Sequence, residues 1–255
     1  MRTLIFASLL LSAHSCESCV PTGSGSGGGG TAVTSRAGDY AYDYLRSDTY
    51  TSVLVEIDYI AGRPPSGLAL DALEEALVTY LDKPDGISLL VDDEIPLSES
   101  PGAWSPQDIR ALEEQYRDHH RDPATGEMVL YFVYLDGHSV YDDGEGRVLG
   151  HTLSGSSLAM FKDTILDRGG PPFVVEQVEP KVIVHELGHV LGLVDNGLPM
   201  QTDRLDHQHG KHDLDPDCLM HWTVSSDRVV DVIQGNASTE FCSHCEDDMA
   251  AARGE

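Results

Sequence analysis

The segment that decides the fold is Val182-Ile183-Val184-His185-Glu186-Leu187-Gly188-His189-Val190-Leu191-Gly192. Its many apolar residues predict a buried helix, and Gly192 predicts where that helix ends. His185 and His189 are separated by one helical turn, so both imidazoles project from the same face. Two imidazoles in this arrangement can bind one Zn²⁺ ion, with Glu186 beside the open coordination position.

These side chains are the set that metal-assisted hydrolysis requires. Zinc polarises the carbonyl of a substrate and lowers the pKa of its bound water to about 7. A neighbouring carboxylate takes the proton from that water and passes it to the leaving group. We therefore expect His185 and His189 to be zinc ligands and Glu186 to be the general base. A core helix with two hydrogen-bonded histidines is the competing interpretation, and a purely structural metal site has no need of Glu186.

Gly192 extends the motif to HExxHxxG, and with it the chain resembles the metzincin metallopeptidases. In that group the glycine turns the chain toward a third zinc ligand, which is usually a histidine. Asp195 stands in the place of that histidine here. One interpretation takes Asp195 as the third ligand. Another treats residues 196–211 as an inserted loop, with the ligand beyond it.

The second interpretation is favoured by His212-Asp213-(x4)-Cys218-Leu219-Met220 and by Cys242-Ser243-His244-Cys245. Their order and spacing resemble the archaemetzincin family, over a stretch from about Ser52 to the C-terminus. The resemblance implies a zinc-dependent peptidase in which His212 is the third ligand and Met220 packs beneath the metal. Asp195 is the next candidate for the third ligand, followed by His209 and His207.

The cysteines near the C-terminus indicate a cross-link. In the resembled family four cysteines hold a structural zinc, and Asp213 replaces the first of them here. The resemblance therefore implies a second Zn²⁺ site formed by Asp213, Cys218, Cys242 and Cys245, with His244 as a substitute ligand. A disulfide is the alternative, and export from the cell would favour it.

The first residues are typical of an export signal, because Arg2 precedes an apolar run that is too short to span a membrane. Cys16 follows small residues as in bacterial lipoprotein signals, which predicts lipidation of Cys16 and an exported protein that is lipid-anchored or secreted. We expect four regions: a signal peptide (1–15), a lipobox cysteine with a Gly/Ser-rich tether (16–49), an N-terminal subdomain (50–192) and a C-terminal subdomain (193–255).

Periodicity in the remaining chain predicts alternating strands and helices. Helices are expected after Ser66 and after Ser105-Pro106, where a capping residue precedes spaced apolar positions. Strands are expected at residues 53–59, 87–91, 128–135, 148–153 and 157–161. This order predicts an α/β (α+β) fold of metzincin type, with a mixed twisted sheet, packed helices and a smaller irregular C-terminal subdomain.

Charge limits the partners of this 255-residue chain, which has 43 acidic and 16 basic side chains and a formal net charge of −27. The negative electrostatic field of this charge repels nucleic acid and anionic lipid, so we expect neither as a partner. Membrane contact is expected only through a lipid anchor. The expected enzyme is a monomer that acts on a peptide or protein. The alternatives are a non-catalytic zinc-binding surface lipoprotein and a zinc hydrolase of non-peptide amides or esters.

Overall fold

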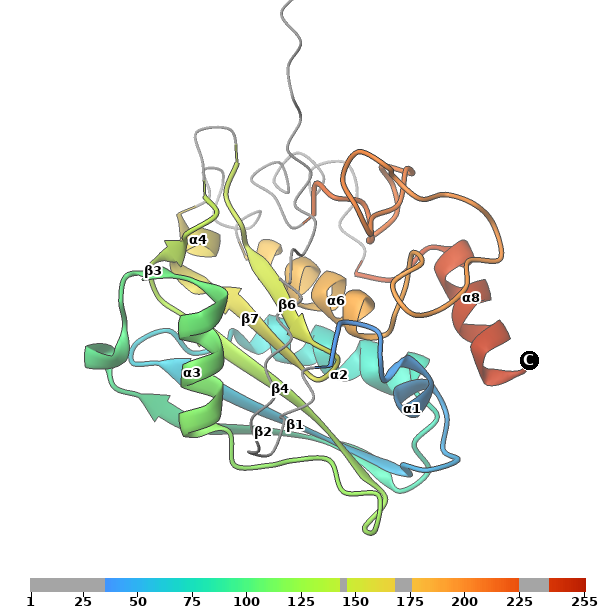
Figure 1. Cartoon of the computed structure of the whole chain (residues 1–255), viewed down its shortest axis with the longest axis horizontal. Helices are drawn as coiled ribbons and strands as arrows, with labels where there is room; N and C mark the ends of the chain where they lie inside the picture. Colours follow the sequence, from blue (N-terminus) through green and yellow to red (C-terminus); the bar gives the residue numbers. More distant parts are fainter. Residues whose placement is uncertain (1–34, 143–145, 168–175, 225–238) are drawn as a thin grey trace, which may run out of the picture.

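The computed structural model describes residues 35–142, 146–167, 176–224 and 239–255. Its centre is a five-stranded sheet of order β2-β1-β4-β7-β6 (Figure 1). Neighbouring strands are parallel except at the β6 edge, where β6 runs antiparallel to β7. The strands are β1 (Ser52–Ile60), β2 (Gly86–Ile95), β4 (Glu127–Leu135), β6 (Gly150–Ser154) and β7 (Ser157–Phe161), with β3 (Ala103–Trp104) and β5 (His138–Ser139) forming a separate parallel pair.

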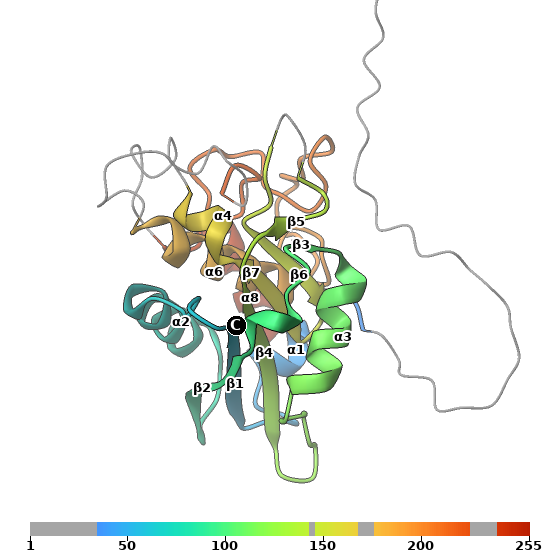
Figure 2. The ribbon, with the colours of Figure 1, turned by 90° about the vertical axis from the view of Figure 1, so that its left-hand side faces the viewer.

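Helices lie on both faces of the sheet. The helices are α1 (Ala41–Leu45), α2 (Gly67–Tyr80), α3 (Pro106–Tyr116), α4 (Lys162–Leu166), α6 (Val178–Val190) and α8 (Ser243–Arg253), with a 3₁₀ turn at Leu97–Glu99. Helices α2 and α6 cover one face and α3 covers the other (Figure 2). Strand β4 is buried on both sides, because Leu130 and Phe132 face α2 and α6 while Tyr131 and Val133 face α3. The predicted mixed α/β fold is confirmed.

The predicted capping residues start their helices as expected. The Ser66 hydroxyl accepts a hydrogen bond from the amide of Ala69 at 3.2 Å. Ser105 and Asp108 form a reciprocal capping box at the start of α3, with Pro106 in the first turn. Each cap satisfies amides that have no partner within the helix, so these local signals are enough to set where α2 and α3 begin.

The folded part of the chain starts earlier than the sequence indicates. Residues 41–45 were expected in the tether, yet they form α1, with Tyr44 and Leu45 fully buried. Helix α1 contacts α8, so this short helix can only be stabilised by residues far away in the sequence. The predicted signal peptide and Cys16 lie outside the described residues. Among the described residues, no helix has the length and apolar character needed to cross a membrane.

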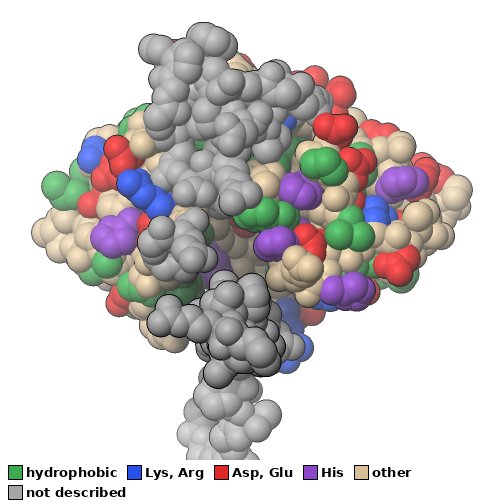
Figure 3. Space-filling view, turned by 90° about the horizontal axis from the view of Figure 1, so that it is seen from above, with side chains coloured by type: hydrophobic (Ala, Val, Ile, Leu, Met, Phe, Trp, Pro, Cys, Tyr) green, Lys and Arg blue, Asp and Glu red, His purple; other side chains and the backbone are tan. Residues whose placement is uncertain are grey.

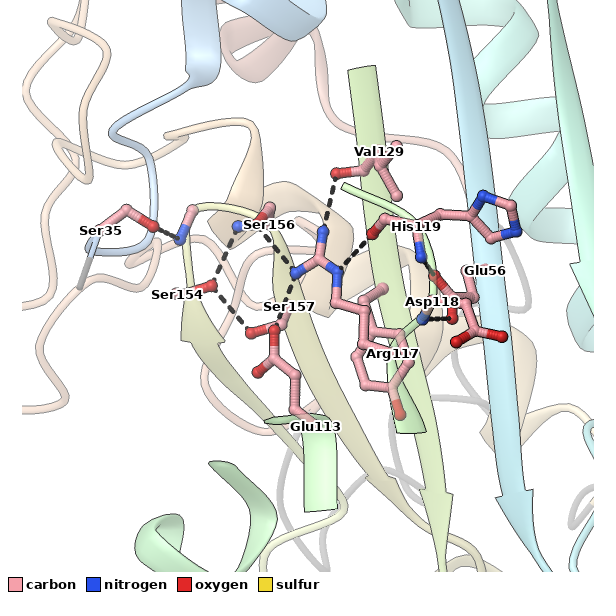
Figure 4. Close-up of polar contacts among 12 residues, drawn as sticks. Ser35, Glu56, Glu113, Arg117, Asp118, His119, Val129, Ser154, Ser156 and Ser157 are labelled. Carbon is pink, nitrogen blue, oxygen red and sulfur yellow. Dashed lines mark hydrogen bonds and ion pairs between the residues drawn. The ribbon is translucent and has the colours of Figure 1, made fainter. Parts of the chain in front are cut away.

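A buried polar network fixes the loop that follows α3 (Figure 4). Glu56 on β1 is fully buried, and its two carboxylate oxygens accept hydrogen bonds from the amides of Asp118 and His119 at 2.7 and 2.9 Å. Arg117 donates to Glu113 at 2.8 Å and to the carbonyl of His119 at 2.9 Å. The loop is therefore tied to the sheet through satisfied buried groups, which maintains the position of α3.

The C-terminal part shares the core of the N-terminal part. Phe241 and Met249 belong to the same buried cluster as Tyr44 and Val182. The ring of Phe241 packs against Tyr80 of α2 with a centroid distance of 5.1 Å. A Cβ atom built on Gly188 would lie 2.9 Å from the Phe241 ring, so the start of α8 is held near the end of α6 where the HExxH motif lies.

Candidate metal centre

Three histidines converge beside α6. His185 and His189 occupy successive turns of the helix, and His212 reaches them from the irregular segment that follows. One ring nitrogen of each residue lies within 4.8 Å of the others. Several histidine side chains are visible on the face of the molecule that is seen from above (Figure 3). The helix supplies two of these groups by its periodicity, whereas the third depends on how the loop folds back.

Hydrogen bonds determine which ring nitrogen of His185 and of His212 is available to bind a metal ion. The Nδ1 atom of His185 lies 2.7 Å from the carbonyl oxygen of Leu219, and that of His212 lies 2.7 Å from the carbonyl oxygen of His209. A carbonyl oxygen only accepts, so each Nδ1 carries the proton and each Nε2 presents a lone pair. Both Nε2 atoms are buried without a hydrogen-bond partner. Buried unpaired acceptors aimed at one point fit a metal ion.

Burial keeps these rings neutral, as metal ligation requires. It lowers the pKa of His185 to about 3, with a further contribution from nearby His212. Burial likewise lowers the pKa of His189 and of His212. The ring nitrogens therefore need not lose a proton to bind a cation near neutral pH.

Glu186 is held in a fixed position between α6 and the edge strand β6. Its side chain is almost fully buried, and its Oε2 atom accepts a hydrogen bond from the Thr152 hydroxyl at 2.8 Å. Burial raises the pKa of Glu186 to about 7. A Cβ atom at Gly150 would lie 2.6 Å from the Glu186 Cγ, so only glycine at this position leaves room for the carboxylate. No spacing in the sequence pointed to Gly150 or Thr152.

Met220 packs directly beneath the histidine pair. Its side chain is fully buried, and its Sδ atom would lie 2.3 Å from a Cβ atom built on Gly188. The helix backbone between His185 and His189 therefore rests on the thioether.

Replacing Gly188 with Ala is expected to destabilise the protein by about 1–3 kcal/mol, because the added methyl group overlaps Met220 and approaches Phe241 in a filled core. Urea unfolding of the full chain measures this change. Gly67→Ala is the matched control, since nothing lies within 4 Å of its Cβ position and φ there is ordinary. Equal midpoints for the two variants would show that the Gly188 contact is not tight.

The other candidates for the third ligand lie apart from the two helical histidines. Asp195 is exposed, and its carboxylate pairs with Lys211 at 3.1 Å. His209 points its Nδ1 toward Asp206 at 2.6 Å and stacks on Trp222 with a centroid distance of 4.2 Å. His207 is exposed. Gly192 has φ of +78° and turns the chain as expected, but the turn leads Asp195 to the surface.

A second cluster lies next to the first. Ligand atoms of Asp213, Cys218, Cys242 and Cys245 all lie within 4.8 Å of one another. The three cysteines are free, and the sulfur of Cys218 lies 3.0 Å from Cys242 and 3.8 Å from Cys245. No disulfide therefore joins any two of these three cysteines. His244 is exposed and lies outside the cluster, which removes it as a substitute ligand.

The two clusters are joined by a short stretch of chain. Asp213 directly follows His212, and its amide donates to the carbonyl of Met220 at 2.9 Å. Cys218 immediately precedes Leu219, whose carbonyl fixes His185. Arg204 also contacts this second cluster, and no motif in the sequence indicated it. The thiol cluster thus supports the segment that completes the histidine site.

The structure thus combines a parallel-dominated α/β sheet, the HExxH helix packed on one of its faces and a third histidine from an irregular C-terminal segment. No protein-family model matches the chain, and no curated protein sequence matches it significantly.

Among solved structures, the chain resembles archaemetzincin from Methanopyrus kandleri. The TM-score is 0.52 at 19% identity, and the match covers 80% of this chain and 96% of that one. A zinc-dependent peptidase from Methanocorpusculum labreanum also matches, with a TM-score of 0.46, 15% identity and coverage of 76% and 99%. The first likeness confirms the archaemetzincin-like fold that the motifs indicated.

Proposed function

We propose that this chain is a zinc-dependent peptidase whose catalytic metal is held by His185, His189 and His212. The observation that carries the proposal is the pair of buried Nε2 atoms, on His185 and His212, that have no hydrogen-bond partner. Both are acceptors by virtue of the carbonyl bonds at their Nδ1 atoms. A neutral, all-imidazole donor set of this kind suits Zn²⁺.

Glu186 is the proposed general base and then general acid. His185, His189 and His212 would hold the Zn²⁺ ion, which would supply a Lewis acid for the substrate carbonyl and would lower the pKa of the attacking water. The Thr152 hydroxyl holds Oε2 of Glu186, so the carboxylate accepts the proton of the water in a fixed orientation. The same group then delivers that proton to the amine that departs. This sequence of proton transfers needs no covalent intermediate.

The edge of the sheet supports a peptide as the substrate. Strand β6 pairs with β7 on one side and is the last strand of the sheet on its other side, within the described residues. An extended peptide can hydrogen-bond to the main chain of such an edge strand. Strand β6 carries Thr152, whose hydroxyl donates a hydrogen bond to Glu186. A peptide bound along β6 would therefore pass beside the proposed catalytic carboxylate.

Asp213, Cys218, Cys242 and Cys245 are the proposed ligands of a second, structural Zn²⁺. Three thiols and one carboxylate without a disulfide among them form a closed set of four donors. A metal at this place would compensate for the absence of helices and strands in residues 191–224, the described residues that follow α6. Its role is therefore to stabilise the segment that carries His212.

Metal analysis together with a substrate panel tests the proposed function. The purified full chain is expected to contain one zinc ion for each of the two clusters, and to cleave casein or blocked peptides. A chelator should abolish cleavage and added Zn²⁺ should restore it, because both steps of catalysis depend on the ion. Activity that persists in zinc-free protein contradicts the proposal. Cleavage of simple esters without cleavage of peptides would identify a non-peptide hydrolase instead.

A further inference from the structure

Arg204 lies buried among the acidic groups of the thiol cluster. Its Nε atom donates to Oδ2 of Asp213 at 2.7 Å, and its Nη2 atom donates to Oδ2 of Asp248 at 2.5 Å. The same Nη2 lies 3.5 Å from the sulfur of Cys245. Arg204 is 6% exposed, and the two aspartates are 0% and 1% exposed. Solvent therefore does little to weaken these contacts.

The bond from Arg204 fixes the direction of the Asp213 carboxylate. Its Oδ1 atom accepts from the amide of Asp215 at 2.9 Å while Oδ2 accepts from Arg204. With a donor on each oxygen the carboxylate cannot rotate freely, and it is held with an oxygen toward the three sulfurs. Carboxylate ligands in metal sites are generally oriented by such outer hydrogen bonds. A thiolate ligand has a single donor atom and needs no such orientation.

Charge gives Arg204 a second effect on the cluster. Three thiolates and the carboxylates of Asp213 and Asp248 would together carry five negative charges in a buried region. A divalent cation neutralises two of these charges, and Arg204 neutralises a third. Buried charges that remain unpaired are costly, so removal of Arg204 should weaken metal binding at the cluster.

We propose that Arg204 is a positioning residue that makes Asp213 an effective fourth ligand of a divalent metal held by Cys218, Cys242 and Cys245; this inference rests on the proposed metal occupancy of that cluster. Arg204 does not touch the metal in this arrangement. It acts through the carboxylate, so its importance depends on Asp213 being a carboxylate and not a thiol.

Cobalt binding to the full chain tests the inference. Co²⁺ bound by cysteine sulfur gives a thiolate charge-transfer absorption, which reports on this cluster and not on the histidines. Competition with a chelator gives its affinity. Arg204→Met is expected to lower this affinity about 10–100-fold, as is common for the loss of an outer hydrogen bond to a ligand. Arg204→Lys should cause a smaller loss, because it keeps the charge but loses the two-pronged contact with both aspartates.

The decisive comparison uses Asp213→Cys, in which the fourth ligand is a thiol. In that background Arg204→Met should cause a loss of affinity at least about threefold smaller than in the wild-type background, since no carboxylate remains to be oriented and only the charge of Arg204 is lost. Arg147→Met serves as a control, because Arg147 pairs with the exposed Asp167 instead. Circular dichroism verifies the fold of each variant, and Arg204→Lys replaces Arg204→Met in both backgrounds if the latter does not fold.

The outcomes separate the inference from the proposed function. Equal Co²⁺ affinities for the wild type and the Arg204 variants overturn the inference about Arg204. An equal loss in the Asp213 and Asp213→Cys backgrounds also overturns it, because Arg204 would then act by charge or by folding alone. Absence of a thiolate band in the wild type shows that the cluster binds no such metal and overturns it as well. Peptide cleavage and zinc at the histidine site, measured on the same samples, judge the proposed peptidase independently.

Discussion

Replacement of Glu186 with Gln is expected to slow peptide hydrolysis by about 10²–10⁴-fold, the usual contribution of a positioned general acid or base. Glutamine has nearly the same shape and still accepts a hydrogen bond from Thr152, but it cannot take a proton from water. Glu186 does not belong to the ligand set of His185, His189 and His212, so the zinc content should not change. The measurement is kcat/KM on a peptide cleaved by the wild type, together with metal analysis.

The matched control for this experiment is Glu75→Gln on α2, where the side chain is exposed and far from the motif in the sequence. Its activity should equal that of the wild type. Full activity of Glu186→Gln would remove Glu186 from the mechanism. If the wild type binds zinc at the histidines but cleaves no peptide, amide or ester, the non-catalytic zinc-binding alternative is correct.

Replacement of His212 with Ala is expected to remove the catalytic metal and, with it, nearly all activity. The loss of an outer-shell partner costs about 10–100-fold in metal affinity, so the loss of a direct ligand should cost more than about 100-fold. His185 and His189 alone leave the ion with too few protein ligands for a catalytic site. The zinc content should fall by one ion per chain, while the thiol cluster keeps its metal.

Asp195→Ala provides the comparison that decides between the two interpretations of the motif. Asp195 pairs with Lys211 at the surface, so its loss should leave zinc content and activity near those of the wild type. The reverse pattern, in which Asp195→Ala loses the metal and His212→Ala keeps it, would assign the third ligand to Asp195. His209→Ala should have a smaller effect than His212→Ala, because the backbone carbonyl that contacts His212 remains in this variant.

The local part of the fold could be predicted because its signals act within a few residues. Ser66 and Ser105 mark the starts of α2 and α3, alternation marks β1, and a continuous apolar and aromatic run marks β4. The shared face of His185 and His189 follows from the helical period alone. In contrast, α1 carries no strong local signal, since a helix of five residues is stable only through its contacts with distant parts of the chain.

The sequence by itself indicated the helix of the HExxH motif, the two histidines that share one of its faces, the Glu186 carboxylate between them and the mixed α/β class. Only the tertiary structure decided which of Asp195, His207, His209 and His212 joins that helix, that Thr152 holds Glu186, and that Arg204 enters the thiol cluster. The reason is physical. A helix places its side chains by a fixed local period, whereas the path of an irregular loop is set by long-range contacts such as the ion pair between Arg204 and Asp248, which no spacing in the sequence encodes.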